Sequence, residues 1–349
     1  TEFYREAFEI ARARVPRIRF SMQSNMLSYN DRWNAVFRDV FAGSISTSWD
    51  PDELCRTVKG SAELYARLYQ SRMAQILEDG WRPKVISTFS EETIHLAHEV
   101  YERALDSARD GRVYDIRLNY RYPAGRASED GPAIQPATYA RALLEIYDRW
   151  ITETPDFLVT PLDQMFLKVT GAEMGRCPWA KGCTGHIIGL EPNFDVYNCG
   201  EFADTGDPAF RFGNLLQDGI DACLTSQAAR ALSMRRIKHP ESCKTCIHFA
   251  ECEGGCMRDS VLFERGLYGK FYYCESWQEL FSRIKESIIT GEADAALEKF
   301  GHDPDKIRDM VQRRVVTGLA EGRTHMRRAV PAADYVPDYE TLNGPVELT

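Results

Sequence analysis

The sequence predicts an α/β protein that continues into a cysteine-rich, metal-binding region. Two observations lead to this prediction. Strand-like and helix-like segments alternate through residues 1–120, and nine of the ten cysteines lie from Cys177 to Cys274, eight of them at close spacing. Strands separated by helices indicate parallel βαβ units with right-handed crossovers. The first part is therefore expected to be a section of an α/β barrel or of an open sheet.

The elements of the first part follow from their apolar periodicity. Apolar residues recur at helical spacing in residues 2–14, and Pro16 then acts as a stop signal. Asp50 and Pro51 are expected to open the long helical region before the third strand. The predicted strands are 17–23, 43–48, 84–88 and 113–120, and the predicted helices are 2–14, 31–41, 50–78 and 91–108.

The pattern changes near Tyr122. The stretch YPAGRASEDGPAIQP is rich in glycine, proline and polar residues, which predicts a loop or a domain boundary. A helix is expected at 137–150, and short strands are expected at 186–191 and 195–199. A further helix at 276–289 follows the last cysteine, and a charged tail follows it.

Composition excludes several classes of function. The chain has 349 residues and a formal net charge of −9, which does not suit binding to a phosphate backbone, so no nucleic-acid partner is expected. No window is apolar enough for a membrane span. The charged start of the sequence, TEFYREAFEI, does not read as a signal peptide, so a cytoplasmic location is expected.

The cysteine spacing points to metal. Disulfides are disfavoured in a reducing compartment, and Cys-x2-Cys lets two thiolates reach one metal centre from a tight loop. Gly254 and Gly255 would let the backbone bend around a bulky inorganic core, whereas Cys55 and Cys223 stand apart and read as ordinary buried thiols. Spacing alone leaves iron–sulfur clusters and structural zinc both open. The candidate ligands are Cys177, Cys183, Cys199, Cys243, Cys246, Cys252, Cys256 and Cys274.

This spacing resembles the SPASM domain of radical S-adenosylmethionine enzymes, in the two-cluster form of anaerobic sulfatase-maturating enzymes and peptide maturases. The resemblance extends over about a hundred residues and rests on the segments EPNFDVYNCG, RFGNL and CKTCIHFAECEGGC. Phe194 departs from the family, which usually has glycine in that turn. The resemblance implies two auxiliary [4Fe–4S] clusters. Their ligands would be Cys177, Cys183, Cys199 and Cys256 for one, and Cys243, Cys246, Cys252 and Cys274 for the other.

The α/β part resembles the later two-thirds of the radical S-adenosylmethionine barrel. RFSMQSNML (19–27) is similar to the family's third strand, and SISTSWDP (44–51) is similar to its fourth. The resemblance places polar side chains at the carboxyl rim of these strands, where parallel α/β folds bind ligands. The implied S-adenosylmethionine contacts are Gln23, Asn25, Ser48 and Arg56, with Asp50, Tyr120, Arg121 and Arg126 nearby.

The resemblance implies a partial barrel (1–130), a helical connector (131–173), a SPASM domain (174–275) and a C-terminal helix and tail (276–349). The family's Cys-x3-Cys-x2-Cys motif is not in the sequence, and the first two barrel strands have no counterpart. S-adenosylmethionine and a third cluster are therefore expected only with that missing segment. The sequence is a piece of a longer enzyme, half of a split enzyme, or a degenerate relative. We favour the first, because a barrel lacking two strands would expose the edge of 17–23.

The resemblance implies a radical enzyme that oxidatively matures a peptide or protein side chain and takes electrons from a reductant such as flavodoxin or ferredoxin. A partner chain that supplies the missing barrel segment is possible. In sulfatase maturases an aspartate follows the cysteine that corresponds to Cys199, but Gly200 stands here, which argues against formylglycine formation. Glu201 and Asp204 are the substitute candidates for a catalytic base. The alternatives are a non-catalytic peptide-binding or electron-transfer partner with two clusters, and a zinc-stabilised scaffold.

Overall fold

The computed structural model describes residues 1–51, 56–123, 133–172, 177, 183–263 and 265–324. These residues form two compact units, Thr1–Gln164 and the part that begins at Met165. The boundaries predicted at 130, 173 and 275 stay predictions. None of the described helices is both long enough and apolar enough to cross a lipid bilayer.

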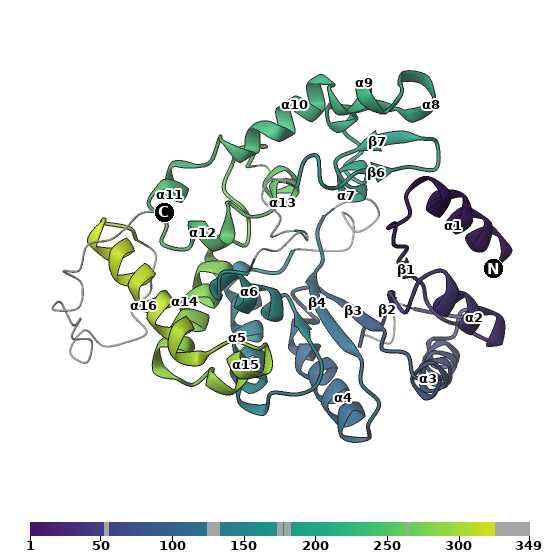
Figure 1. The fold of residues 1–349 in the computed structure, drawn as a ribbon, viewed down its shortest axis with the longest axis horizontal. Helices are drawn as coiled ribbons and strands as arrows, with labels where there is room; N and C mark the ends of the chain where they lie inside the picture. The colour runs from purple at the N-terminus through teal and green to yellow at the C-terminus, as the bar shows by residue number, and fades with distance from the viewer. Residues whose placement is uncertain (52–55, 124–132, 173–176, 178–182, 264, 325–349) are drawn as a thin grey trace. The chain divides into compact units, whose positions relative to one another are not determined.

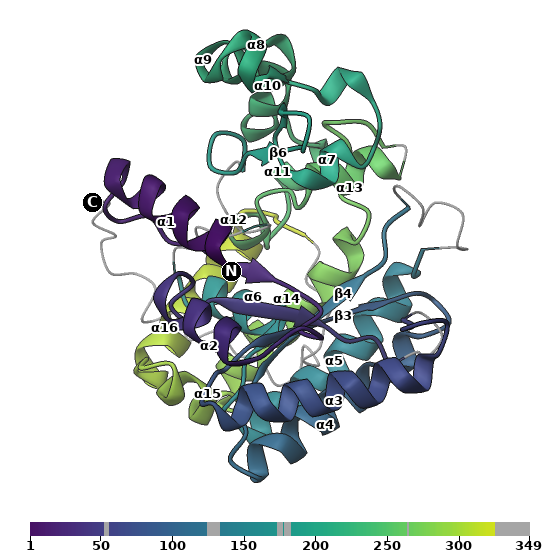
Figure 2. The same cartoon turned by 90° about the vertical axis from the view of Figure 1, so that its right-hand side faces the viewer.

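A parallel sheet organises the first unit, as the sequence predicts. Its five strands follow one another across the sheet in chain order, and every neighbouring pair is parallel. A sheet of this order has all its right-handed crossovers on one face. Figure 1 and Figure 2 show α3, α4 and α5 together along one face of the sheet. The strands are β1 (Met22–Gln23), β2 (Ile45–Ser48), β3 (Lys84–Phe89), β4 (Asp115–Tyr120) and β5 (Val159–Thr160).

Four helices of the first unit lie near their predicted places, one begins later than predicted, and the last was not predicted. The helices are α1 (Glu2–Arg14), α2 (Asp31–Asp39), α3 (Ala62–Glu78), α4 (Ala97–Arg109), α5 (Pro136–Glu153) and α6 (Leu162–Val169), the last of which crosses into the second unit.

The prediction that a helix opens at Asp50 and Pro51 is wrong, because α3 begins at Ala62. The Ser61 hydroxyl accepts a hydrogen bond from the Leu64 amide at 3.1 Å, which caps α3 there. Asp50 instead accepts a hydrogen bond from the Thr88 amide at 2.9 Å, so its side chain is tied to β3.

The second unit holds a small antiparallel sheet and many short helices. Strands β6 (Gly189–Leu190), β7 (Asp195–Tyr197) and β8 (Gly213–Asn214) pair in that order. Helix α14 packs against α16. The helices are α7 (Gly200–Ala203), α8 (Leu215–Asp218), α9 (Ile220–Leu224), α10 (Gln227–Ser233), α11 (Glu241–Lys244), α12 (Phe249–Cys252), α13 (Met257–Leu262), α14 (Cys274–Thr290), α15 (Asp294–Lys299) and α16 (Pro304–Ala320).

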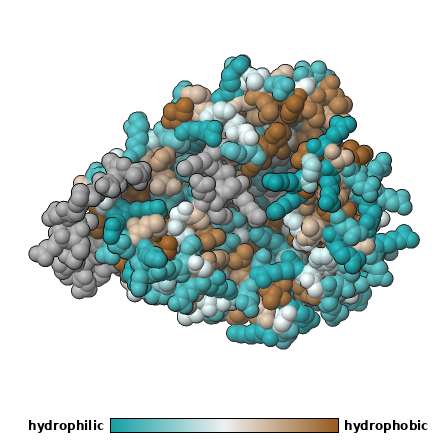
Figure 3. Space-filling model, viewed as in Figure 1, coloured by the Kyte–Doolittle hydropathy of each residue, from teal (hydrophilic) through white to brown (hydrophobic). Residues whose placement is uncertain are grey.

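Apolar side chains gather on part of the surface of the second unit. Figure 3 shows them over β6, β7, α8 and α9. Exposed apolar side chains that lie together are typical of surfaces that bind another molecule. The large exposed apolar residues in this region are Ile188, Leu190, Phe194, Leu216, Ile220 and Leu224.

The turn between β6 and β7 holds Phe194 in a left-handed conformation, with φ of 68°. Its amide donates a hydrogen bond to the Glu191 carbonyl at 2.8 Å, which closes the turn. A residue with a Cβ is strained there, whereas glycine is not. Glycine, which is usual at this position in the family that the sequence resembles, would adopt this left-handed conformation without strain.

We predict that Phe194→Gly is more stable than Phe194→Ala. Both variants remove the ring, but only glycine relieves the strain, so the difference is expected to be about 0.5–1 kcal/mol after the larger entropy of the unfolded glycine chain is subtracted. Denaturant unfolding of the two variants measures it. An alanine variant as stable as the glycine variant would contradict the prediction.

Candidate functional site

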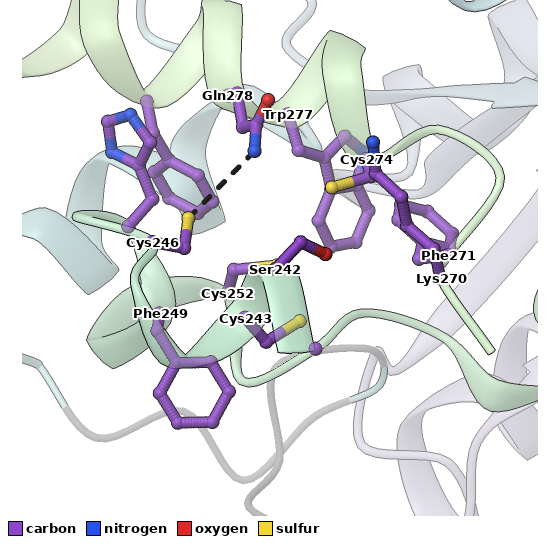
Figure 4. Close-up of a pocket in the computed structure, with 13 residues that line it drawn as sticks. Ser242, Cys243, Cys246, Phe249, Cys252, Lys270, Phe271, Cys274, Trp277 and Gln278 are labelled. Carbon is purple, nitrogen blue, oxygen red and sulfur yellow. Dashed lines mark hydrogen bonds between the residues drawn. The ribbon is translucent and has the colours of Figure 1, made fainter. Parts of the chain in front are cut away.

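Four cysteines surround one cavity in the second unit (Figure 4). Cys243 lies in α11, Cys246 in the turn after it, Cys252 at the end of α12 and Cys274 at the start of α14. The Cys246 amide donates to the Cys243 carbonyl at 3.3 Å, and the Cys252 amide donates to the His248 carbonyl at 2.8 Å. Short helices and turns thus bring together cysteines that are up to 31 residues apart in the sequence.

Aromatic side chains form a large part of the wall of this first cavity. Phe249, Phe271, Trp277 and Phe281 line it, which keeps water away from the sulfur atoms. The Gln278 side-chain amide lies 3.9 Å from the Cys246 sulfur (Figure 4). Apolar surroundings and N–H groups directed at sulfur are the features by which proteins tune iron–sulfur clusters.

The thiols of this group resist ionisation without a metal. Burial raises the pKa of Cys243 and of Cys252, and burial raises that of Cys274 to about 11. A bound metal removes such protons, because its charge stabilises the thiolate. Four soft sulfur donors around one apolar cavity therefore fit a thiolate-bound metal group. Within the described part of the chain, no three His, Cys, Asp or Glu side chains are close enough to hold a single metal ion.

A buried ion pair supports the loop that carries two of these cysteines. Lys285 of α14 lies 3.1 Å from Glu251 of α12, and both side chains are almost fully buried. The Lys285 ammonium also donates to the Ile247 carbonyl at 3.2 Å, and it lies 3.2 Å from Nδ1 of His248. These contacts fasten the segment between Cys246 and Cys252 to the helix that begins at Cys274.

The second group of cysteines lies around another cavity, of about 480 Å³, in the same unit. Cys177, Cys183 and Cys256 line this second cavity. Cys199 belongs to the same apolar cluster as Cys183. Burial is the main cause that raises the pKa of Cys199 to about 11, and Cys183 contributes to the shift. Seven of the eight candidate cysteines thus line one or the other cavity, and Cys199 packs in the apolar cluster beside Cys183; their roles as ligands stay a prediction.

Two glycines permit close packing beside the cysteines. A Cβ on Gly189 of β6 would lie 2.5 Å from the backbone carbon of Cys199. Gly255 has φ of 69°, and a Cβ there would lie 2.6 Å from the Phe271 ring. Larger residues at these positions would push the strand or the turn away from the cysteines. The sequence reasoning pointed to Gly255 but not to Gly189.

A buried guanidinium lies beside the second cavity. Arg235, in the 3₁₀ turn Met234–Arg236, is 6% exposed and lines this cavity. Burial lowers its pKa, and the charges on Cys243, Cys256 and Cys252 oppose that shift. Sequence reasoning missed this residue, because RRIKH reads as a run of surface charges.

The candidate S-adenosylmethionine contacts lie in the first unit, and the structure brings some of them together. The Gln23 amide donates to the Ser48 hydroxyl at 3.0 Å, and these residues end β1 and β2. Gln23 and Asn25 line a cavity of about 260 Å³. Arg56 does not line it; its guanidinium lies 2.7 Å from Asp50.

The remaining described candidates near the strand ends, Tyr120 and Arg121, do not line this cavity. Tyr120 ends β4 and packs edge-to-face on Tyr139, with ring centroids 5.3 Å apart. The Arg121 amide donates to the Phe89 carbonyl at 2.8 Å, which continues the strand pairing. Arg126 and Cys55 lie outside the described residues, whereas Cys223 is buried, as predicted.

The two candidate bases lie next to Cys199 in the sequence, but their surroundings differ. Glu201 of α7 pairs with Arg258 of α13, with 2.7 Å between Oε2 and Nη1. Asp204 is exposed at the end of α7. Arg258 also lies 2.9 Å from Asp259, a fully buried carboxylate that the sequence reasoning did not single out.

We predict that Lys285 and Glu251 stabilise the second unit as a pair. Lys285→Met leaves a buried carboxylate without its cation and is expected to lower the free energy of unfolding by about 3–5 kcal/mol. The double variant Lys285→Met/Glu251→Leu is expected to lose much less than the sum of the single variants. Denaturant unfolding of the four proteins measures the coupling, and additive losses would contradict it.

Two sequence relatives of the chain are maturases. The chain is 24% identical over 163 residues to the cysteine-type anaerobic sulfatase-maturating enzyme of Clostridium perfringens. This alignment covers 45% of this chain and 42% of that enzyme. The chain is 29% identical over 158 residues to the mycofactocin maturase MftC of Mycolicibacterium smegmatis, with 45% and 38% covered. The matched region thus spans less than half the length of these relatives. No family model matches the chain.

Solved structures share the fold. Native anSMEcpe with bound AdoMet and Cp18Cys peptide aligns with a TM-score of 0.65 at 17% identity, over 84% of this chain and 82% of that chain. Streptococcus suis SuiB bound to the precursor peptide SuiA aligns with a TM-score of 0.51 at 11% identity, over 76% and 60%. These relatives and neighbours are radical S-adenosylmethionine/SPASM enzymes, so the resemblance that the cysteine spacing indicates is confirmed.

Proposed function

We propose that this chain is part of a radical S-adenosylmethionine maturase that oxidises a peptide or protein side chain with the help of two auxiliary [4Fe–4S] clusters. The observation that carries the proposal is the gathering of seven cysteines around two cavities of one unit, with Cys199 packed beside Cys183. The names of the sequence relatives, which are maturases, support the reaction class.

The proposed domains are those that the resemblance implies: a partial barrel (1–130), a connector (131–173), a SPASM domain (174–275) and a C-terminal helical extension (276–349). The parallel sheet in chain order supports the partial barrel, since a closed barrel of βα units has the same order. Strand β1 is the outer strand of the described sheet, which suits a further strand from a preceding segment or from a partner chain.

The proposed ligand sets are Cys177, Cys183, Cys199 and Cys256 for one cluster, and Cys243, Cys246, Cys252 and Cys274 for the other. When bound, such clusters would supply one-electron transfer. The aromatic side chains of the first cavity would keep water away from the cluster there. The Gln278 amide would point at the Cys246 sulfur of the same cluster. The buried Lys285–Glu251 pair would fix the spacing of three of the ligands.

The proposed substrate is a peptide or protein. Two solved neighbours hold a bound peptide, and the exposed apolar residues around β6 and α8 offer a surface that suits one. Glu201 and Asp204 remain the proposed candidates for a base near Cys199. Gln23, Asn25, Ser48 and Arg56 remain the proposed S-adenosylmethionine contacts, together with a third cluster if the missing segment is present. A flavodoxin or ferredoxin would supply electrons.

The first test is metal analysis. The chain, purified without oxygen and reconstituted, is expected to hold about eight irons with matching sulfide. About two zinc ions without sulfide would instead indicate a structural scaffold and overturn the proposal.

Single cysteine variants test the ligand sets. We predict that Cys246→Ala and Cys256→Ala each lose about four irons per chain and become less soluble, because metal binding is coupled to folding at such sites. The matched control is Cys223→Ala, which removes a buried thiol outside both sets and is expected to keep all its iron. Full iron content in either ligand variant would exclude that cysteine as a ligand.

A further inference from the structure

Arg235 is held in place by backbone carbonyls. Its Nη1 donates to the carbonyls of Leu267 at 3.2 Å and Gly269 at 2.7 Å, and its Nη2 donates to the carbonyl of Gly254 at 2.9 Å. These bonds fix the guanidinium between the loop before Cys274 and the turn before Cys256. Its Nε, which is also buried, has no hydrogen-bond partner among the described residues.

The charge of Arg235 is not balanced by a carboxylate in the described part of the chain. Its hydrogen-bond partners there are neutral carbonyls, and its side chain borders the cavity lined by Cys177, Cys183 and Cys256. A buried charge is costly unless an opposite charge lies near it. Three cysteines line the same cavity as Arg235, so the anionic counterpart is expected to be thiolate-bound metal.

The position of Arg235 relates it to both cysteine sets. Cys252 and Cys256 belong to different sets and are joined by a turn of three residues, Glu253–Gly255. Arg235 binds the carbonyl of Gly254, the middle residue of that turn. One guanidinium therefore fastens the short segment that connects the two sites and lies close to thiols of each.

We propose that Arg235 is a positioning residue shared by the two clusters, which holds the Cys252–Cys256 turn and raises the reduction potential of both clusters through its charge. This inference rests on the proposed function. A reduced cluster carries one more negative charge than the oxidised cluster, so a nearby cation stabilises the reduced state. The effect is strong where water is excluded, as it is around Arg235.

The experiment compares Arg235→Gln, which removes the charge, with Arg235→Lys, which keeps the charge but cannot make the same fork of hydrogen bonds. The control is Arg230→Gln, which removes the same charge from an exposed position in α10. The reconstituted proteins are titrated with dithionite under redox mediators, and the reduced fraction of each cluster is followed by electron paramagnetic resonance. Iron content and thermal midpoint are measured on the same samples.

In Arg235→Gln the ratio of reduced to oxidised cluster at a fixed ambient potential is expected to fall about tenfold for both clusters, or about 59 mV for a one-electron couple. Arg235→Lys is expected to keep both midpoints near wild type while its thermal midpoint falls, and Arg230→Gln is expected to change neither.

Unchanged midpoints in a fully loaded Arg235→Gln protein, or a shift confined to one cluster, would overturn the shared role while leaving the proposed function intact. If Arg235→Gln does not retain its clusters, Arg235→Lys decides: wild-type midpoints support the inference, and a tenfold fall despite the retained charge overturns it. Wild-type protein that holds zinc without sulfide overturns this inference and the proposed function together.

Discussion

The burial of cysteine thiols among aromatic side chains is the constraint on which the structure of the second unit depends. Aromatic side chains close the first cavity, and the resulting desolvation raises the pKa of the thiols around it. Few long elements can converge in so small a space. Short helices and tight turns do so instead, and each of α11, α12 and α14 contributes a cysteine at or near its end.

The buried polar groups of this unit follow from the same constraint. Turns that surround a cavity lack the regular hydrogen bonding of long helices, so other groups must hold them. Lys285 binds the Ile247 carbonyl, and Arg235 binds the Gly254 carbonyl, each next to cysteine-bearing segments. The long side chains of Lys285 and Arg235 thus hold backbone carbonyls in place in this unit, as strand pairing does in the first unit.

The sequence predicted the long elements α5 and α14 well, since each buries one face and shows it in its spacing. Helix α1 was predicted as well, although none of its residues is buried. The sequence reasoning missed β5 and β8, which have two residues each and no periodicity, and it missed α15 and α16, where charged residues masked the apolar face. It extended a helix to Asp50 because local capping signals do not reveal that this side chain binds the Thr88 amide. The resemblance grouped Cys243, Cys246, Cys252 and Cys274, which line one cavity in the structure. The supporting cations were not predicted, although Lys285 could have been noticed between Ile284 and Ile288 on a buried helix face.

The turn between Cys252 and Cys256 has a consequence for how such chains can vary in length. With only three residues between the cysteines, an insertion or deletion there would displace one set of cysteines relative to the other. The segment between Cys199 and Cys243 is far longer and contains the exposed helices α8 and α9, so it can gain or lose residues without moving either set. Length variation among related proteins should accordingly concentrate in that segment, and recombination between such proteins should succeed there and fail at the turn.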